Sequence, residues 1–302
     1  MRPVASDMTI ALVSDVFFGN DSDRRLRGRL QEARAAGAAL SILPELPLDP
    51  WYPANQKPGA EESELPGGRR FQALAKAAKA AQIGLVGGAI IQDPGSPERR
   101  HNTALVFDGM GNLVGEYRKC HLPQEPGYWE RSHYRAGDQP PAPFSTFPIP
   151  FGVQVCSDVN RPAGSQVLAA LGADLIVVPR ATEPKTYSRW RLVFQSIAIT
   201  SCVFVASVNR PRAESGVDIG GPSVVVGPDG QILVETTDPL ATVTIEAAAV
   251  EAARSKYPGY LAVRADLYAR AWTDVAQKRE STTPPTEQLS REAQRKGGQR
   301  RS

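Results

Sequence analysis

Between about residues 7 and 270, short apolar runs alternate with amphipathic segments, and this alternation restricts the fold more than any other feature of the chain. The apolar runs are rich in β-branched residues, which is typical of strands covered by helices. The segments between them carry apolar residues at helical spacing. We expect strands at 9–18, 40–46, 85–91, 151–158, 174–181, 202–211 and 242–250, and helices at 21–37, 71–84, 162–172 and 186–201.

Two further segments have the pattern of β-hairpins. Residues 101–119 contain two β-rich arms around a Gly-Met-Gly-Asn turn, and residues 222–236 contain two arms around Pro-Asp-Gly. These turn residues are typical of tight connections between antiparallel strands. Hairpins argue against a wholly parallel sheet, so we predict an α/β fold in which mixed sheets are covered by helices.

Charge and composition exclude several classes of protein. The formal net charge of +3 is far below that of a typical nucleic-acid-binding domain. No apolar run reaches the roughly 18 residues that span a bilayer, and the first residues do not resemble a signal peptide. The sequence contains no phosphate-binding loop and no Gly-x-Gly-x-x-Gly turn. We therefore expect neither nucleic acid nor membrane as a partner, and no nucleotide chemistry.

The three cysteines, Cys120, Cys156 and Cys202, have spacings that fit neither a zinc finger nor a redox pair. They cannot all pair with one another, which favours a reducing, cytoplasmic compartment. The three histidines are too scattered along the chain to indicate a metal site. We therefore expect no metal.

Residues 275–302 differ in composition from the rest of the chain. They contain seven Lys or Arg against three Asp or Glu, few apolar residues and a Pro-Pro pair. Such a segment cannot bury enough apolar surface to offset its ordering entropy. We expect one domain over residues 1–274, followed by a basic, disordered tail at 275–302. RNA binding by this tail is the alternative.

Reactive side chains stand at the ends of three predicted strands. Glu45 ends an apolar run before a proline-rich loop, Lys119 ends the return arm of a hairpin, and Cys156 ends an apolar run before a polar turn. Strand ends at one rim of a sheet are where α/β proteins assemble sites from distant parts of the sequence. We therefore expect these three residues to meet.

The chemistry of the three residues is that of acyl transfer. A cysteine thiolate attacks an acyl carbon, a carboxylate takes the thiol proton and later activates water, and an ammonium group stabilises the oxyanion. This set requires neither histidine nor metal. A cysteine, a lysine or a glutamate alone is more often structural, and we assign structural roles to Cys120 and Cys202.

The segments LPELPLDPWYP, YRKCHLP and VQVCSDVNRP resemble the three signature blocks of the nitrilase (carbon–nitrogen hydrolase) superfamily, in that family's order. The segment YRKCHLPQEPGYWERSHYRAGD is similar to the lysine block of its N-carbamoyl amidohydrolases, and GGPSVVVGPDGQIL is similar to its later hairpin. The resemblance covers residues 7–250. It implies an αββα sandwich that pairs with a second subunit as a homodimer or a higher homo-oligomer.

The resemblance also implies site residues. Glu45, Lys119 and Cys156 would form a catalytic triad, and Glu130 would hold the lysine. The backbone N–H of Ser157 would be the second oxyanion donor. No cofactor is implied.

The sequence departs from the family pattern around the nucleophile. Ser157-Asp158 follows the cysteine where true nitrilases have Trp-Glu, and this resembles the amidase and carbamoylase branches. Val159 occupies the position at which amino-acid carbamoylases place a carboxylate-binding arginine, and Ala163 replaces a family glutamate. These changes leave the substrate open. Asp158 is expected to fix the cysteine loop through hydrogen bonds to the backbone.

Four residues are candidates for substrate binding. Trp51 and Tyr52 closely follow Glu45 and would line the pocket, with packing under the proline-rich loop as the alternative. Arg180 should face the same rim, and either Arg180 or Arg161 could clamp a substrate carboxylate. A structural ion pair is the alternative for the arginines.

The sequence thus predicts a cytoplasmic cysteine hydrolase that cleaves a linear C–N bond in a small amide or N-carbamoyl compound through a thioester. Hydrolysis of a nitrile by the same thiol is one alternative. A catalytically inactive binding protein with the same fold is another.

Overall fold

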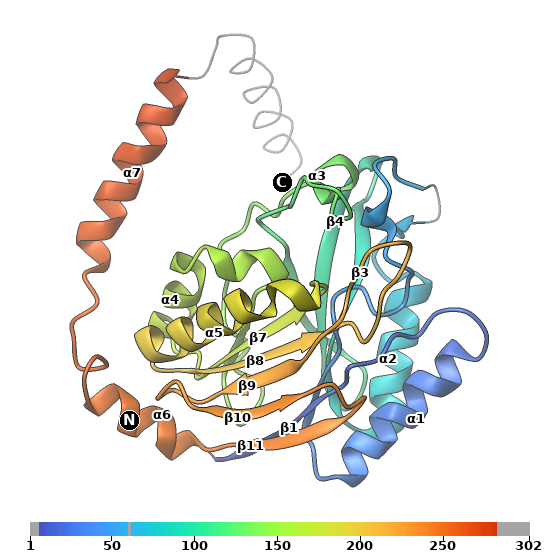
Figure 1. Ribbon diagram of the computed structural model, residues 1–302, viewed down its shortest axis with the longest axis horizontal. Coiled ribbons are helices and arrows are strands. Elements are labelled where there is room, and N and C mark those ends of the chain that lie inside the picture. The colour runs from blue at the N-terminus through green and yellow to red at the C-terminus, as the bar shows by residue number, and fades with distance from the viewer. Residues whose placement is uncertain (1–5, 60–61, 283–302) are drawn as a thin grey trace. The chain divides into compact units, whose positions relative to one another are not determined.

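The structure is a computed structural model of the chain, and it describes residues 6–59 and 62–282 (Figure 1). The chain divides into two compact units, one ending at Tyr260 and the other starting at Leu261. The first unit contains two β-sheets and the helices that flank them. No helix within the described ranges is long and apolar enough to cross a membrane.

The first sheet has six strands among the described residues, in the order β11-β1-β2-β3-β4-β5. Strands β1, β2 and β3 are parallel, whereas β11 pairs antiparallel with β1, and β4 lies antiparallel between β3 and β5. The bounds are β1 (Met8–Leu12), β2 (Leu40–Ile42), β3 (Gly84–Asp93), β4 (Ser96–Phe107), β5 (Leu113–Arg118) and β11 (Ala241–Ile245).

The second sheet has five strands in the described part of the chain, in the order β10-β9-β8-β7-β6. Strands β6, β7 and β8 are parallel, and β9 and β10 form the later hairpin. The bounds are β6 (Phe151–Val153), β7 (Leu175–Arg180), β8 (Phe204–Asn209), β9 (Ser223–Val226) and β10 (Ile232–Thr236). Both sheets are therefore mixed, as the two hairpins predicted.

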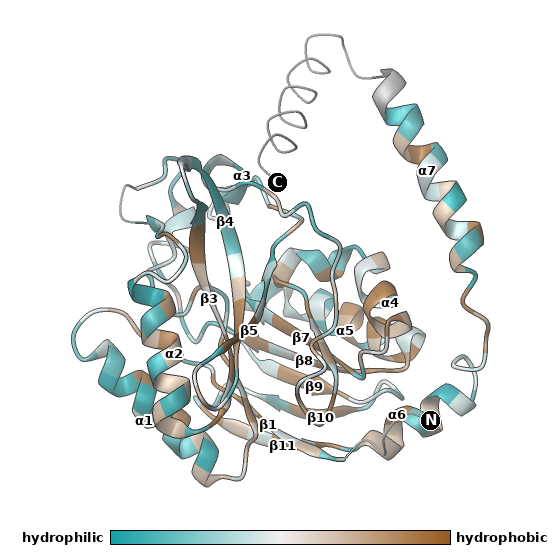
Figure 2. Cartoon of the chain, turned by 180° about the vertical axis from the view of Figure 1, so that it is seen from behind, coloured by the Kyte–Doolittle hydropathy of each residue, from teal (hydrophilic) through white to brown (hydrophobic). Residues whose placement is uncertain are grey.

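Helices cover the outer face of each sheet. Helices α1 (Ser22–Ala35) and α2 (Arg69–Ala81) lie on the first sheet, and α4 (Ala163–Ala170) and α5 (Tyr187–Ser201) lie on the second (Figure 1). In α1 the buried residues Leu26, Leu30 and Ala33 form the predicted apolar stripe. Hydrophobic residues gather on the strands and on the inner sides of these helices (Figure 2). The result is the αββα sandwich.

Alternation along the strands divides the core into layers. In β7, Leu175 and Val177 point into the cluster between the sheets, whereas Ile176 and Val178 point into the cluster under α4 and α5. Every residue of β7 is buried because both faces of the sheet are covered. A Cβ at Gly87 in β3 would come within 2.7 Å of Leu74 on α2, so glycine lets the helix pack closely on this strand.

The predicted strands end earlier than the apolar runs do. The run 151–158 is a strand only to Val153 and then enters the short 3-10 turn η3 (Cys156–Asn160). The run 242–250 leaves β11 at Ile245 and forms helix α6 (Ala247–Ser255), since alanine favours a helix.

The second unit contains helix α7 (Ala265–Thr282). The first part of the segment predicted to be a disordered tail, residues 275–282, is therefore helical, and the predicted boundary at 274 falls inside a helix. Alanine and long charged side chains favour this helix. The rest of the predicted tail, 283–302, lies outside the described residues.

Candidate active site

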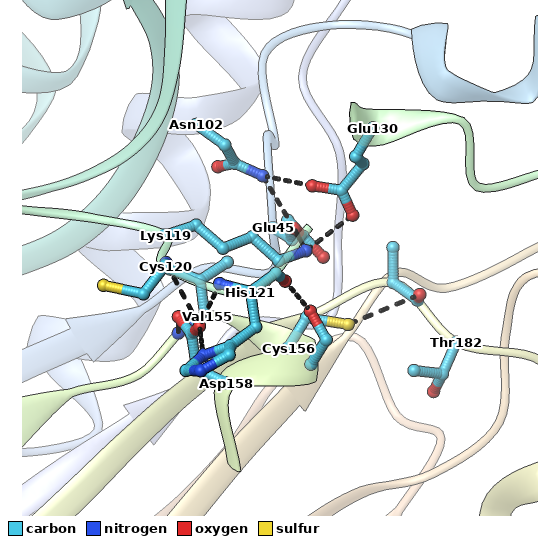
Figure 3. A network of polar contacts seen from close by, with 12 residues as sticks. Glu45, Asn102, Lys119, Cys120, His121, Glu130, Val155, Cys156, Asp158 and Thr182 are labelled. Atoms are coloured by element: carbon cyan, nitrogen blue, oxygen red, sulfur yellow. Dashed lines mark hydrogen bonds and ion pairs between the residues drawn. The ribbon is translucent and has the colours of Figure 1, made fainter. Parts of the chain in front are cut away.

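Three strand ends bring the predicted catalytic residues together. Glu45 follows β2, Lys119 directly follows β5, and Cys156 begins η3 after β6. Strand β5 runs antiparallel to β4, which runs antiparallel to β3, so β5 has the direction of β2 and β3. The carboxyl ends of β2 and β5 therefore lie at the same edge of the first sheet. Figure 3 shows Cys156 beside Glu45 and Lys119.

Lys119 lies between two carboxylates. Its Nζ donates to Glu45 Oε1 at 2.8 Å and to Glu130 Oε1 at 2.5 Å. Asn102 Nδ2 donates to the same Glu45 oxygen at 2.8 Å and to Glu130 Oε2 at 3.3 Å. The side chains of the lysine and the two glutamates are at most 1% exposed. The ammonium thus faces two acids, away from water, in a fixed position.

The electrostatics of this cluster follow from burial and proximity. Burial opposes the charge on Lys119, but the carboxylates of Glu130 and Glu45 raise its pKa well above the usual value. Burial, opposed by the ammonium of Lys119, raises the pKa of Glu130 to about 7. Lys119 therefore stays cationic at neutral pH, while Glu130 exchanges its proton near neutrality.

Cys156 is buried and stands at a sharp bend. Its φ of 49° is in the left-handed region, which non-glycine residues rarely adopt and which recurs at functional sites. Its Sγ lies 3.9 Å from the carbonyl oxygen of Ala181. Burial, followed by the carboxylate of Glu45, raises the pKa of the thiol, against the influence of Lys119. The resting thiol is therefore protonated and needs a base before it can attack.

One carboxylate oxygen at the site is free to act as that base. Oε2 of Glu45 is buried and has no hydrogen-bond partner among the described residues, while Oε1 receives both Lys119 and Asn102. A buried carboxylate oxygen without a partner is costly, which indicates a functional use.

Asp158 joins the segment that carries the lysine to the segment that carries the cysteine. Its Oδ1 accepts the backbone N–H groups of Cys120 at 3.1 Å and His121 at 2.8 Å, and its Oδ2 accepts that of Val155 at 3.2 Å. The hydroxyl of Tyr117 also donates to Oδ2 at 2.8 Å. Asp158 thus fixes the cysteine loop through backbone hydrogen bonds, as the sequence predicted.

Ser157, the predicted second oxyanion donor, follows the cysteine in η3 and is half-buried. Its hydroxyl donates to the carbonyl oxygen of His121 at 2.5 Å, which adds to the bonds that Asp158 makes between the cysteine and lysine segments.

The two predicted aromatic residues have different surroundings. Trp51 is fully buried, donates from Nε1 to the carbonyl oxygen of Gly127 at 2.8 Å, and meets the ring of Tyr128 edge-on at 5.8 Å. Tyr52 lines a separate surface pocket near the starts of α1 and α2, together with Asp49 and Arg70. Trp51 thus packs under the proline-rich loop, as the alternative expected, and Tyr52 lines a different pocket; a role in substrate binding stays a prediction for both.

The two predicted arginines lie outside the cluster. Arg161 is exposed at the end of η3. Arg180 is fully buried, and its guanidinium donates to Ser207 Oγ at 2.8 Å, to Thr182 Oγ1 and to the carbonyl oxygen of Pro222. The guanidinium is thus bonded within the protein, and we do not assign Arg180 a role in binding a substrate carboxylate. Its side chain follows Val178 on β7 and faces α5, not the rim that the sequence analysis expected.

Arg210 and Asn102 contact the site but were not predicted from the sequence. The guanidinium of Arg210 is fully buried, pairs with both oxygens of Glu214 at 3.0 and 2.6 Å, and donates to the carbonyl oxygens of Glu45 and Leu46 at 2.9 and 2.7 Å. It therefore holds the backbone at the acid. Asn102 is a polar residue within an apolar hairpin arm, and Arg210 directly follows the apolar strand β8. Both positions interrupt an apolar pattern, and that signal could have identified them.

Comparison with known proteins places this geometry in context. Residues 25–255 match the family model described as "Carbon-nitrogen hydrolase". An omega-amidase from Homo sapiens is 30% identical over 262 residues, covering 83% of this chain and 92% of the relative. An N-carbamoylputrescine amidase from Arabidopsis thaliana is 26% identical over 273 residues, covering 84% of this chain and 88% of the relative.

Solved structures share the fold. A carbon–nitrogen hydrolase from Helicobacter pylori G27 superposes with a TM-score of 0.80 at 22% identity, covering 88% of this chain and 98% of that one. A double mutant of the amidase from Nesterenkonia sp. AN1, in complex with acrylamide, superposes with a TM-score of 0.73 at 27% identity. It covers 90% of this chain and 99% of that one.

Proposed function

The chain belongs to the carbon–nitrogen hydrolase family of the nitrilase superfamily, and on that premise we propose that it hydrolyses the C–N bond of a small amide or N-carbamoyl compound. The observation that carries this proposal is the buried contact of Lys119 with Glu45 and Glu130 beside Cys156. A cysteine beside a carboxylate and an ammonium group is suited to acyl transfer through a thioester.

In the first step, Oε2 of Glu45 takes the proton of the Cys156 thiol as the sulfur attacks the carbonyl carbon. The raised pKa of the thiol makes proton removal and attack coincide, because a free thiolate would be costly in this buried position. Oε2 is suited to this role because it has no other hydrogen-bond partner in the described parts of the chain.

In the second step, the carbonyl oxygen becomes an oxyanion that the Lys119 ammonium and the Ser157 backbone N–H stabilise. Two glutamates hold the ammonium in place, so little reorganisation is needed when the charge develops. Exclusion of water strengthens this interaction. Glu130 acts through Lys119, as a positioning residue.

In the third step, Glu45 returns its proton to the leaving nitrogen, and the C–N bond breaks to give ammonia or an amine and a thioester on Cys156. Glu45 then takes a proton from a water molecule, which attacks the thioester. The acid leaves, and the thiol recovers its proton. The same carboxylate thus serves as base, acid and base again.

The test is ammonia release from a panel of small amides, N-carbamoyl amino acids and N-carbamoyl amines, with one nitrile and its matching amide included. We expect turnover of at least one amide or carbamoyl compound, and a loss of at least about 10⁴-fold in Cys156→Ala. Cys202→Ala is the control, because this buried thiol lies at the end of α5. Turnover of the nitrile in preference to its amide, or full activity of Cys156→Ala, would contradict the proposal.

We further infer that a second copy of the chain pairs with the first through α4 and α5. These helices carry the exposed apolar residues Val167, Leu171, Leu192 and Ile199, which are 39–67% accessible. A patch of this kind favours an interface. Sedimentation should give a dimer that Leu192→Asp weakens.

The three free thiols support a reducing, cytoplasmic location.

A further inference from the structure

The hydroxyl of Tyr128 is buried and lacks a hydrogen-bond partner among the residues that the structure describes. A tyrosine hydroxyl can both donate and accept, and one that is buried without a partner destabilises the fold. Buried tyrosines usually find a partner for this group. The unused hydroxyl therefore needs an explanation.

The position of Tyr128 is fixed by its surroundings. Its N–H donates to the carbonyl oxygen of Glu125 at 2.9 Å, which closes a tight turn. The neighbouring Gly127 accepts from Trp51 Nε1 at 2.8 Å, and the indole ring lies edge-on to the Tyr128 ring at 5.8 Å. The hydroxyl is thus presented by a braced turn and is not left over from a mobile loop.

Tyr128 packs against a buried cluster that contains Leu46, the residue after Glu45, and Ala181, whose carbonyl oxygen lies 3.9 Å from Cys156 Sγ. The hydroxyl therefore belongs to the surroundings of the active site. Burial raises the pKa of Tyr128, and the nearby Cys156, Glu183 and Glu45 raise it further. The hydroxyl therefore stays protonated and neutral. Among the described residues, neither this hydroxyl nor Oε2 of Glu45 has a hydrogen-bond partner.

The proposed reaction supplies a group that needs such a partner. Lys119 and the Ser157 N–H take the carbonyl oxygen of the substrate, and Glu45 exchanges a proton with the thiol and the leaving nitrogen. An amide or ureido nitrogen enters this buried site with N–H groups that require acceptors. The oxygen of Tyr128 is an acceptor that no described residue uses.

We propose that the Tyr128 hydroxyl accepts an N–H of the nitrogen attached to the scissile carbonyl, and so turns the lone pair of that nitrogen toward Glu45. This inference rests on the proposed function. It makes Tyr128 a specificity-determining residue that favours amides and carbamoyl compounds over esters. The hydroxyl only binds the substrate and exchanges no proton.

The test compares Tyr128→Phe with the wild type on an amide and on an ester of the same acyl group. We expect kcat/KM to fall about tenfold for the amide, equivalent to about 1.4 kcal/mol, and less than about twofold for the ester, which has no N–H at this position. The thermal midpoint should stay unchanged or rise, because the substitution removes a buried hydroxyl that lacks a partner.

Tyr187→Phe is the matched control. Its hydroxyl is also buried, but it lies on α5, where its ring packs on Arg180. This variant should keep the wild-type ratio of amide to ester activity. If ester turnover is too slow to measure, single-turnover kinetics with the amide replace it: Tyr128→Phe should slow acylation and leave deacylation unchanged, because the acyl-enzyme has lost the nitrogen.

Three results would overturn the inference. An equal fall for amide and ester, with a lower thermal midpoint, would mean that Tyr128 is structural. An unchanged amide rate in Tyr128→Phe, with Cys156-dependent turnover intact in the wild type, would refute this inference and leave the proposed function standing. Absence of amide and carbamoyl turnover in the wild type would remove the proposed function and this inference with it.

Discussion

Two fully buried cations, Lys119 and Arg180, occupy contrasting environments in this molecule. Lys119 contacts two carboxylates, and one oxygen of the Glu45 carboxylate has no hydrogen-bond partner in the part of the chain that the structure describes. Arg180 donates to two hydroxyls and a carbonyl oxygen and lies over the rings of Tyr187 and Phe194, and within the described residues no carboxylate pairs with it.

The contrast separates a reactive cation from a structural one. The acceptors around Arg180 are neutral, and burial lowers its pKa to about 10 without changing its charge at pH 7. The groups around Lys119 carry charge and include atoms with unused bonding capacity. Burial alone therefore does not identify a catalytic cation. A catalytic cation is identified by partners that are charged and that keep an atom without a hydrogen bond.

The largest effect is expected at the reactive cation. Lys119→Met should lower kcat/KM about 10³-fold, because the oxyanion loses its charged donor. The variant should also unfold more easily, since Glu45 and Glu130 would then face each other without a cation. Steady-state kinetics on any amide substrate check the first effect. Activity within tenfold of the wild type would mean that Lys119 is structural, like Arg180.

A pH titration distinguishes the two cations, because a partner of Lys119 titrates near neutrality and the partners of Arg180 do not. Glu130, with its pKa raised by burial to about 7, is ionised above that pH and protonated below it. Protonation removes one of the two charges that hold Lys119. We therefore expect kcat/KM to fall on the acid side of pH 7, approaching about tenfold per pH unit.

Glu130→Gln is the control for this titration, because glutamine keeps the shape of the side chain but cannot titrate. Its plateau activity should be lower, and its kcat/KM should lack the limb near pH 7. An identical limb in the wild type and the variant would assign the titration to another group.

The smallest effect on activity is expected at the structural cation. Arg180→Met should keep kcat/KM within about threefold of the wild type. Its free energy of unfolding should fall by about 2 kcal/mol, because Thr182 and the carbonyl oxygen of Pro222 lose their donor. Chemical denaturation and kinetics on the same preparation check both. A loss of activity larger than the loss in Lys119→Met would reverse the assignment of the two cations.

The meeting of three members of the cluster could be predicted because each lies shortly after the end of a strand. Glu45, Lys119 and Cys156 stand where an apolar run meets polar residues, and the sandwich fold brings those ends together. The mixed sheets covered by helices followed from the alternation of strands and helices and from the two hairpins, and the αββα layers followed from the family resemblance.

The face on which Arg180 lies could not be predicted from the sequence. Every residue of β7 is buried, so its pattern does not distinguish the side toward the sheets from the side toward α5. The partners of Asn102 and Arg210 were also out of reach, since Arg210 contacts the backbone of Glu45 across 165 positions of sequence. Contacts at such separation depend on how the two sheets stack, which local patterns do not specify.

Helix α7 was not predicted, and its last residues, 275–282, fall in the segment predicted to be a disordered tail. The low apolar content of residues 275–302 indicated disorder, but α7 continues to Thr282 through alanine and long charged side chains, which favour a helix without a core.

The most direct test of the central claim is mass spectrometry of the protein quenched in acid during turnover of a slow amide substrate. We expect an adduct with the mass of the acyl group on Cys156, with no adduct on Cys120 or Cys202 and none in Cys156→Ala. An adduct on another cysteine, or continued turnover by Cys156→Ala, would contradict it.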